Sequence, residues 1–123
     1  MIKCLCVVCI FIVFDILTGL LAALKKGKFK SSTMRKGLIS KVGEIVSVLL
    51  FMGIEVLLPY INIIINLPLV QFITIYIVLM EIGSIIENIG RINPKVAELC
   101  VNIFDEFKNS IGFGGDESND QRN

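Results

Sequence analysis

Three carboxylates interrupt long runs of leucine, isoleucine, valine and phenylalanine in this chain. Asp15, Glu55 and Glu81 each fall within or near an apolar segment. A carboxylate at the centre of a bilayer costs roughly 2.5–3.5 kcal/mol, so such a group must face other helices or water. Asp15 lies deepest within its segment and is therefore the first candidate for a functional role.

The sequence leaves three interpretations of these carboxylates open. They could form hydrogen bonds between helices and hold an oligomer together. They could line a water-filled lesion once several copies have assembled. One of them could be a proton or cation site in a small transporter, since intramembrane carboxylates mark such pathways.

The sequence lacks the residues that most often carry out catalysis or bind metal ions. The chain has no histidine and no tryptophan, and it contains no nucleophile-and-base set, phosphate loop or ligand cluster. Cys4, Cys6 and Cys9 lie in an apolar segment and match no zinc spacing, and Cys100 stands alone. We interpret the four as free thiols acting as small apolar residues, with a redox or metal role as the alternative. The sequence predicts neither an enzyme nor a cofactor.

Three apolar segments must position the carboxylates, and each is long enough to cross the ~30 Å hydrocarbon layer as a helix. They run over residues 2–24, 38–58 and 69–89 of a chain that is 54% hydrophobic and only 19% charged. We expect an all-α integral membrane protein with three transmembrane helices in a single membrane domain, residues 1–111. The first segment is expected to be retained and not cleaved as a signal peptide, because Asp15 interrupts it and cations follow.

Small or polar residues recur along one face of each predicted span. In the first span, a carboxylate, a hydroxyl and two small residues are spaced at i, i+3, i+4 and i+7, so they share a helical face. Small residues let helices approach closely, and polar side chains can hydrogen-bond across the contact. This predicted polar face, expected to be an oligomer contact or a lumen lining, comprises Asp15, Thr18, Gly19, Ala22, Glu55, Glu81, Ser84 and Asn88.

A cationic stretch separates the first two spans and is expected to be a loop over residues 25–37. The basic residues of this region are Lys25, Lys26, Lys28, Lys30, Arg35, Lys36 and Lys41. By the positive-inside rule the stretch is cytoplasmic, which places the N-terminus outside and the C-terminus in the cytoplasm. Ser32 or Thr33 is expected to cap the second helix, and Lys41 is expected to pair with Glu44 at the membrane interface.

The remaining segments read as connections and surface structure. Residues 59–68, with a proline at each end, are expected to form the turn at the opposite interface. Asn93 and Pro94 are typical of a helix start. Residues 94–111 then carry an apolar stripe opposite charged residues, which predicts an amphipathic helix on the bilayer surface or against a partner. Residues 112–123 have the composition of a disordered polar tail.

Several of these features occur together in one known family, in the same order. The matching residues are Asp15-Ile16-Leu17-Thr18-Gly19, Ala23, Ser31-Ser32, Arg35-Lys36-Gly37, Lys41, Glu55, Ser84-Ile85-Ile86-Glu87-Asn88-Ile89 and Pro94. With them the chain resembles the phage lysis and toxin-secretion holin family, the group that contains the clostridial toxin-export holins. From Lys95 onward it departs from the often basic tails of that family, with six acidic and three basic residues.

The resemblance implies a function in host-cell lysis. Holins accumulate in the bacterial inner membrane and then assemble abruptly into lesions that let an endolysin reach the cell wall, or that release toxins. The implied partners are the lipid bilayer, further copies of the chain and, functionally, an endolysin, without nucleic acid. A small proton-coupled transporter and a non-pore accessory membrane subunit remain alternatives.

Overall fold

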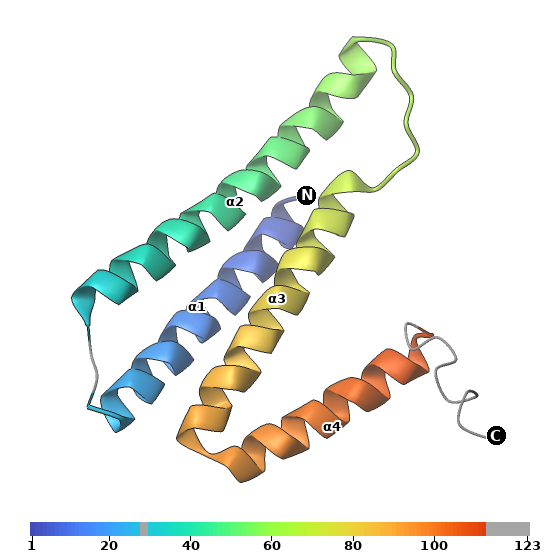
Figure 1. Ribbon diagram of the computed structural model, residues 1–123. Coiled ribbons are helices and arrows are strands. Elements are labelled where there is room, and N and C mark those ends of the chain that lie inside the picture. Colours follow the sequence, from blue (N-terminus) through green and yellow to red (C-terminus); the bar gives the residue numbers. More distant parts are fainter. Residues whose placement is uncertain (28–29, 113–123) are drawn as a thin grey trace, which may run out of the picture.

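The computed structural model describes residues 1–27 and 30–112, and within them all regular structure is helical. Its four helices are α1 (Ile2–Lys25), α2 (Ser31–Tyr60), α3 (Leu69–Ile92) and α4 (Pro94–Ser110). Helices α1, α2 and α3 run alongside one another in alternating directions, whereas α4 turns away at the end of α3 (Figure 1). The first three form the bundle that positions the polar residues.

Three of the helices are long and apolar enough to cross a membrane, with 24, 30 and 24 residues in α1, α2 and α3. At 1.5 Å per residue, 24 residues extend about 36 Å, more than the ~30 Å hydrocarbon layer. The predicted all-α membrane fold with three spans and a C-terminal amphipathic helix is confirmed. The single membrane domain remains a prediction.

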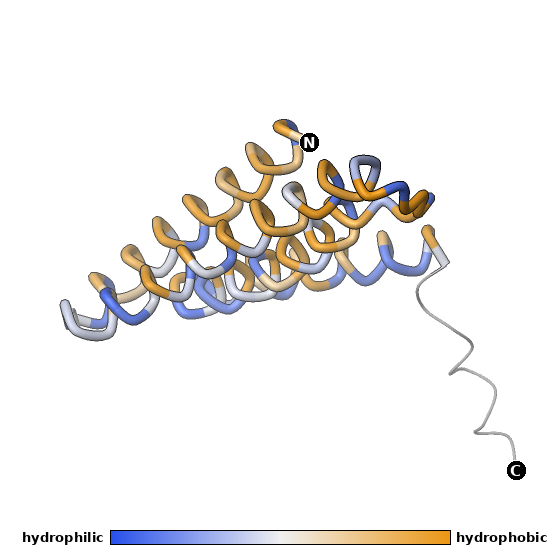
Figure 2. Tube along the Cα trace, turned by 90° about the horizontal axis from the view of Figure 1, so that it is seen from above, coloured by the Kyte–Doolittle hydropathy of each residue, from blue (hydrophilic) through white to orange (hydrophobic). Residues whose placement is uncertain are grey.

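Most large apolar side chains point away from the bundle. Phe14, Leu21 and Leu50 are each more than half exposed, and apolar residues dominate the three long helices (Figure 2). The interior cluster is small by comparison and consists of Val8, Ile12, Val48, Val70 and Ile77. So much exposed apolar surface is expected where the surrounding medium is hydrocarbon, which satisfies these side chains without burying them in protein.

The second helix begins earlier than the sequence predicts. Residues 31–37, expected to belong to the basic loop, form the first turns of α2, which begins six positions after α1 ends at Lys25. Neither Ser32 nor Thr33 caps the helix, since both lie inside it and Lys30 occupies the N-cap position. Serine and glycine carry only modest helix penalties, about 1 kcal/mol for glycine, and neighbouring methionine, arginine and lysine favour the helix.

The turn at the opposite end is shorter than predicted, because α2 continues through Pro59 to Tyr60. Asn62 then adopts a left-handed backbone conformation, φ 58°, which asparagine tolerates better than most residues. The Ile63 N–H donates to the Leu58 carbonyl at 3.0 Å and closes the helix end. The connection to α3 is therefore confined to residues 61–68.

The start of α4 matches the sequence prediction. The Asn93 side chain accepts a hydrogen bond from the Lys95 N–H at 3.2 Å, and Pro94 occupies the first turn. This cap fixes where the chain leaves α3, because a proline fits the first helical position and its missing N–H costs nothing there. Of the predicted disordered tail, residues 112–123, all but Gly112 lie outside the described residues.

Candidate functional site: a charged network between three spans

Asp15, Lys41 and Glu81 come from three different helices but lie at matching heights in the bundle. Asp15 precedes the end of α1 by ten residues, Lys41 follows the start of α2 by ten, and Glu81 precedes the end of α3 by eleven. Since the helices alternate in direction, all three residues stand about 15 Å from the same end of the bundle. That distance corresponds to about half of the ~30 Å hydrocarbon layer.

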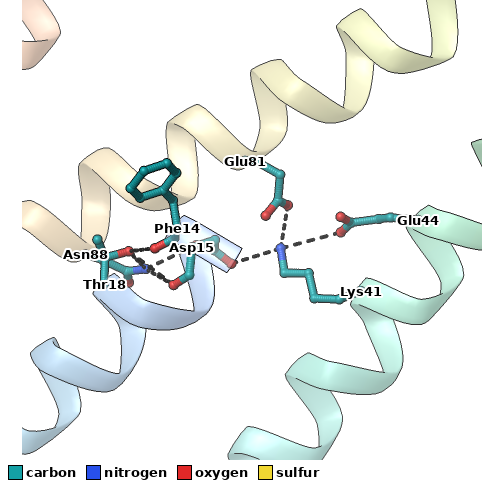
Figure 3. A network of polar contacts seen from close by, with 7 residues as sticks. All are labelled: Phe14, Asp15, Thr18, Lys41, Glu44, Glu81 and Asn88. Atoms are coloured by element: carbon teal, nitrogen blue, oxygen red, sulfur yellow. Dashed lines mark hydrogen bonds and ion pairs between the residues drawn. The ribbon is translucent and has the colours of Figure 1, made fainter. Parts of the chain in front are cut away.

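The Lys41 ammonium group lies at the centre of a buried ionic network (Figure 3). Its Nζ atom is 2.9 Å from Asp15 Oδ2 and 3.6 Å from Glu44 Oε1. It also donates a hydrogen bond to Glu81 Oε1. We call Asp15, Lys41, Glu44 and Glu81 the Lys41 network; it joins α1, α2 and α3 through a single side chain.

Burial makes this network energetically important. The Glu81 side chain is 2% exposed, and those of Asp15, Glu44 and Lys41 are 11%, 13% and 14% exposed. Three carboxyl groups thus surround one ammonium group, and within the described residues Glu44 Oε2 and Glu81 Oε2 have no hydrogen-bond partner. Leaving polar atoms without partners in a medium of low dielectric is costly, so the arrangement is sensitive to any change in charge or hydration.

A second set of hydrogen bonds links the same aspartate to Asn88, which lies two turns beyond Glu81 on the same face of α3. Asn88 Nδ2 donates to Asp15 Oδ1 at 3.1 Å, to the Asp15 carbonyl oxygen at 3.3 Å and to Thr18 Oγ1 at 3.2 Å. Thr18 in turn donates to the Phe14 carbonyl oxygen at 2.8 Å. Asp15 is therefore held on one side by Lys41 and on the other by an amide (Figure 3).

Small residues make this close approach possible. A Cβ atom placed on Gly19 would lie 3.4 Å from Asn88 Nδ2, so the absence of a side chain leaves room for the amide. Ala22 is also buried, at 2% exposure. Close packing of small residues is the usual way in which membrane helices bring polar groups within hydrogen-bond distance.

The structure brings most of the predicted polar face together within one chain. Asp15, Thr18, Gly19 and Asn88 meet between α1 and α3. Glu81 is joined to Asp15 through Lys41, and Ala22 and Ser84 line a neighbouring cavity. Glu55 is separate, because it accepts a hydrogen bond from the Val70 N–H at 2.9 Å at the start of α3. It thereby satisfies a free helix N–H, as an N-cap side chain would, but from a neighbouring helix.

Lys41 is the residue whose role the sequence does not reveal. Its predicted pairing with Glu44 is present, and both side chains are largely buried in the bundle. The sequence groups Lys41 with the basic loop because it follows six other cations and the second helix is expected to start at residue 38. Since α2 begins at Ser31, Lys41 instead lies three turns into the helix, at the same height as Asp15.

The other cations of the predicted basic region that the structure describes lie near the bundle end. Lys25 donates a hydrogen bond to the Ile92 carbonyl at the end of α3, which ties α1 to α3 there. Lys26 and Lys30 flank the connection, and Arg35 and Lys36 are exposed on the first turns of α2. Lys28 lies outside the described residues.

Residues 1–27 and 30–112 contain neither a candidate metal site nor a disulfide. This part of the chain holds no group of three His, Cys, Asp or Glu side chains arranged for a metal ion. Its four cysteines are free. The arrangement that the structure does provide is a charged, hydrogen-bonded contact at membrane depth.

Comparison with known proteins gives one match. The sequence model of the bacteriophage holin family matches residues 1–109, a range that takes in the three spans and nearly all of α4. Searches of the curated proteins and of the solved structures each found no match. The matched range includes every residue of the Lys41 network.

Proposed function

The chain belongs to the bacteriophage holin family, and from that premise we propose that it oligomerises in the bacterial inner membrane and forms lesions that release an endolysin or a toxin. The observation that carries this proposal is the Lys41 network. It places three carboxyl groups and an ammonium group at membrane depth in a protein whose outer surface is apolar. Such groups mark pathways for water or ions in membrane proteins.

The network suggests two states of the chain. In the single chain, Lys41 and Asn88 satisfy Asp15 within the bundle, so the polar residues are hidden from lipid. In the assembled state, neighbouring copies bring the same residues to a shared aqueous lumen, where water hydrates the carboxyl groups. Hydration offsets the cost of opening the network, since the carboxylate oxygens that lack donors in the bundle gain them from water.

The size of the bundle requires several copies for any lesion. Val8, Ile12, Val48, Val70 and Ile77 form an apolar core shared by the three spans. Bundles of so few helices have packed interiors, and a passage wide enough for a protein must be surrounded by many helices. The lesion is therefore proposed to be a homo-oligomer.

The proposed orientation follows from the cations at one end of the bundle. Lys26, Lys30, Arg35 and Lys36 are exposed there, which favours the cytoplasmic side. Helix α4 begins at the same end and exposes Leu99, among other apolar residues, opposite its charged side. This helix is proposed to lie in the interface of the inner leaflet.

Induced expression in a bacterium tests the proposed function. Growth is expected to continue until membrane potential, followed with a voltage-sensitive dye, collapses abruptly at a reproducible time. Asp15→Leu is expected to shift that time or abolish the collapse. Phe14→Leu is the matched control, because Phe14 is its neighbour and faces outward at 54% exposure. Unchanged timing for Asp15→Leu at equal membrane levels would contradict a role of the network in triggering.

Cysteine labelling tests the orientation separately. Ser32→Cys, in a variant whose four native cysteines are replaced by alanine, is expected to resist a membrane-impermeant maleimide before the potential collapses. It should react once the membrane is permeabilised. Labelling of intact cells at this position would reverse the proposed topology.

A small proton- or cation-coupled transporter is the second candidate. Glu44 Oε2 and Glu81 Oε2, which have no hydrogen-bond partner among residues 1–27 and 30–112, favour it, because they are the kind of acceptor that a proton or cation would occupy. A transporter would raise resistance to toxic cations at expression levels that leave the membrane potential intact. An accessory subunit would change neither resistance nor potential.

A further inference from the structure

A cavity of about 630 Å³ lies between α1, the first turns of α2 and the end of α3. Its volume falls within the range of small-molecule sites, roughly 300–1,000 Å³. The Lys41 network forms one boundary, through Asp15 and Lys41, and Asn88 and Ser84 line the side contributed by α3. The cavity adjoins the contact between α1 and α3 that holds Asp15, since Asp15, Gly19 and Asn88 belong to both.

The walls of this cavity are mainly apolar. Ile16, Leu20 and Ala23 contribute from α1, and Met34 and Leu38 contribute from α2. From Ile16 to the end of α1 the chain rises about 15 Å, which is close to the depth of one leaflet. The apolar walls therefore extend from the bundle end to the middle of the membrane.

Cations surround the cavity at the bundle end. Lys26, Lys30 and Arg91 all line it, and they come from the end of α1, the start of α2 and the end of α3. Arg91 forms an ion pair with Glu87 at 3.0 Å, whereas Lys26 and Lys30 form no ion pair within the described residues. Asp15 is the acidic residue of the lining, and it lies about 15 Å from the bundle end, where it is paired with Lys41. Positive charge is thus left over at the level of the lipid headgroups.

We propose that this cavity binds one anionic phospholipid of the inner leaflet, with its phosphate near Lys26, Lys30 and Arg91 and an acyl chain along the apolar walls. Basic pockets between spans on the cytoplasmic side are suited to anionic headgroups. The charge distribution favours a lipid over a helix of a second copy, because a helix would present no phosphate to these cations. Only the assignment to the inner leaflet rests on the proposed orientation.

Native mass spectrometry of the full chain in detergent tests the proposal with phosphatidylglycerol and phosphatidylcholine of the same acyl chains. Phosphatidylglycerol is expected to bind at one copy per chain and more tightly than phosphatidylcholine. The double variant Lys26→Gln/Lys30→Gln should weaken the binding of phosphatidylglycerol about thirtyfold, because each lysine near the headgroups contributes ~1 kcal/mol. Arg35→Gln/Lys36→Gln removes the same charge from α2 outside the cavity, and should change affinity less than about threefold.

A second variant fills the cavity without changing charge. Gly37 lines the cavity, and a Cβ atom there meets nothing within 4 Å, so Gly37→Leu can be accommodated in the folded bundle. The Gly37→Leu substitution should weaken the binding of both lipids at least tenfold. Gly43→Leu is the matched control, since Gly43 is equally open on the same helix but does not line the cavity.

Three results would overturn the proposal. The first is equal affinity for the two lipids, and the second is an equal effect of the two double variants. The third is that lipid is found only on dimers and Gly37→Leu abolishes those dimers, which would assign the cavity to a second copy. None of these results depends on whether the chain triggers lysis, so the proposed function and this lipid site can fail independently.

Discussion

Replacing Lys41 by methionine is the most direct perturbation of the bundle. The substitution keeps a long, flexible side chain and removes the only ammonium group among Asp15, Glu44 and Glu81. At an effective dielectric constant of 20, each unit-charge pair at about 4 Å contributes roughly 4 kcal/mol before desolvation is subtracted. Removing one partner of a buried ionic group typically costs about 3–5 kcal/mol, because the other charges remain buried without compensation. We therefore expect Lys41→Met to destabilise the bundle by about 3–5 kcal/mol.

The measurement is unfolding of the purified chain in mixed micelles as the denaturing detergent fraction rises, with helicity followed by circular dichroism. Lys36→Met provides the matched control, since Lys36 is exposed on the same helix and should change stability by less than about 0.5 kcal/mol. Adding Glu81→Gln to Lys41→Met removes one of the carboxylates left uncompensated. The double variant should be more stable than the sum of its single variants predicts, by about 1–3 kcal/mol.

Either of two outcomes would contradict an ionic contact that joins the three spans. If Lys41→Met costs no more than Lys36→Met, the ionic contacts do not hold the three spans together. If Lys41→Met and Glu81→Gln add without coupling, the two side chains do not interact in the folded protein. Either result would also remove the structural basis of the proposed two-state mechanism.

Three further substitutions test other contacts by the same unfolding measurement. Asn88→Leu removes an amide whose two N–H groups serve three acceptors; at about 0.6 kcal/mol for each N–H it should cost about 1 kcal/mol, and a neutral effect would show that the amide is not engaged. Gly19→Leu should separate α1 from α3 and destabilise the bundle by about 1–3 kcal/mol, whereas Gly53→Leu, with open space around it, should not. Glu55→Leu frees the Val70 N–H and should cost about 0.5–2 kcal/mol, with helicity lost first at the start of α3 if the contact acts as a cap.

The sequence alone determined the class of protein and the number of spans. Hydropathy over twenty residues is a local property, and the ~30 Å hydrocarbon layer converts it directly into a helix count. The grouping of Asp15, Thr18, Gly19 and Ala22 on one face was equally accessible, because helical periodicity is local too. The Asn93-Pro94 pair likewise marks the start of α4, since a helix cap depends only on residues adjacent in the chain.

The tertiary structure decided which residues those faces meet. Lys41 and Asp15 are 26 positions apart and Glu81 is 40 positions beyond Lys41, so their contact depends on where each helix starts and how the three align. A start of α2 at Ser31 and not near residue 38 changes Lys41 from a loop cation into the centre of a buried network. Sequence periodicity specifies the face on which a side chain lies, but only packing sets the height and the partner. For this chain, periodicity identifies polar residues on each helix, and packing brings Asp15, Lys41 and Glu81 into one ionic contact.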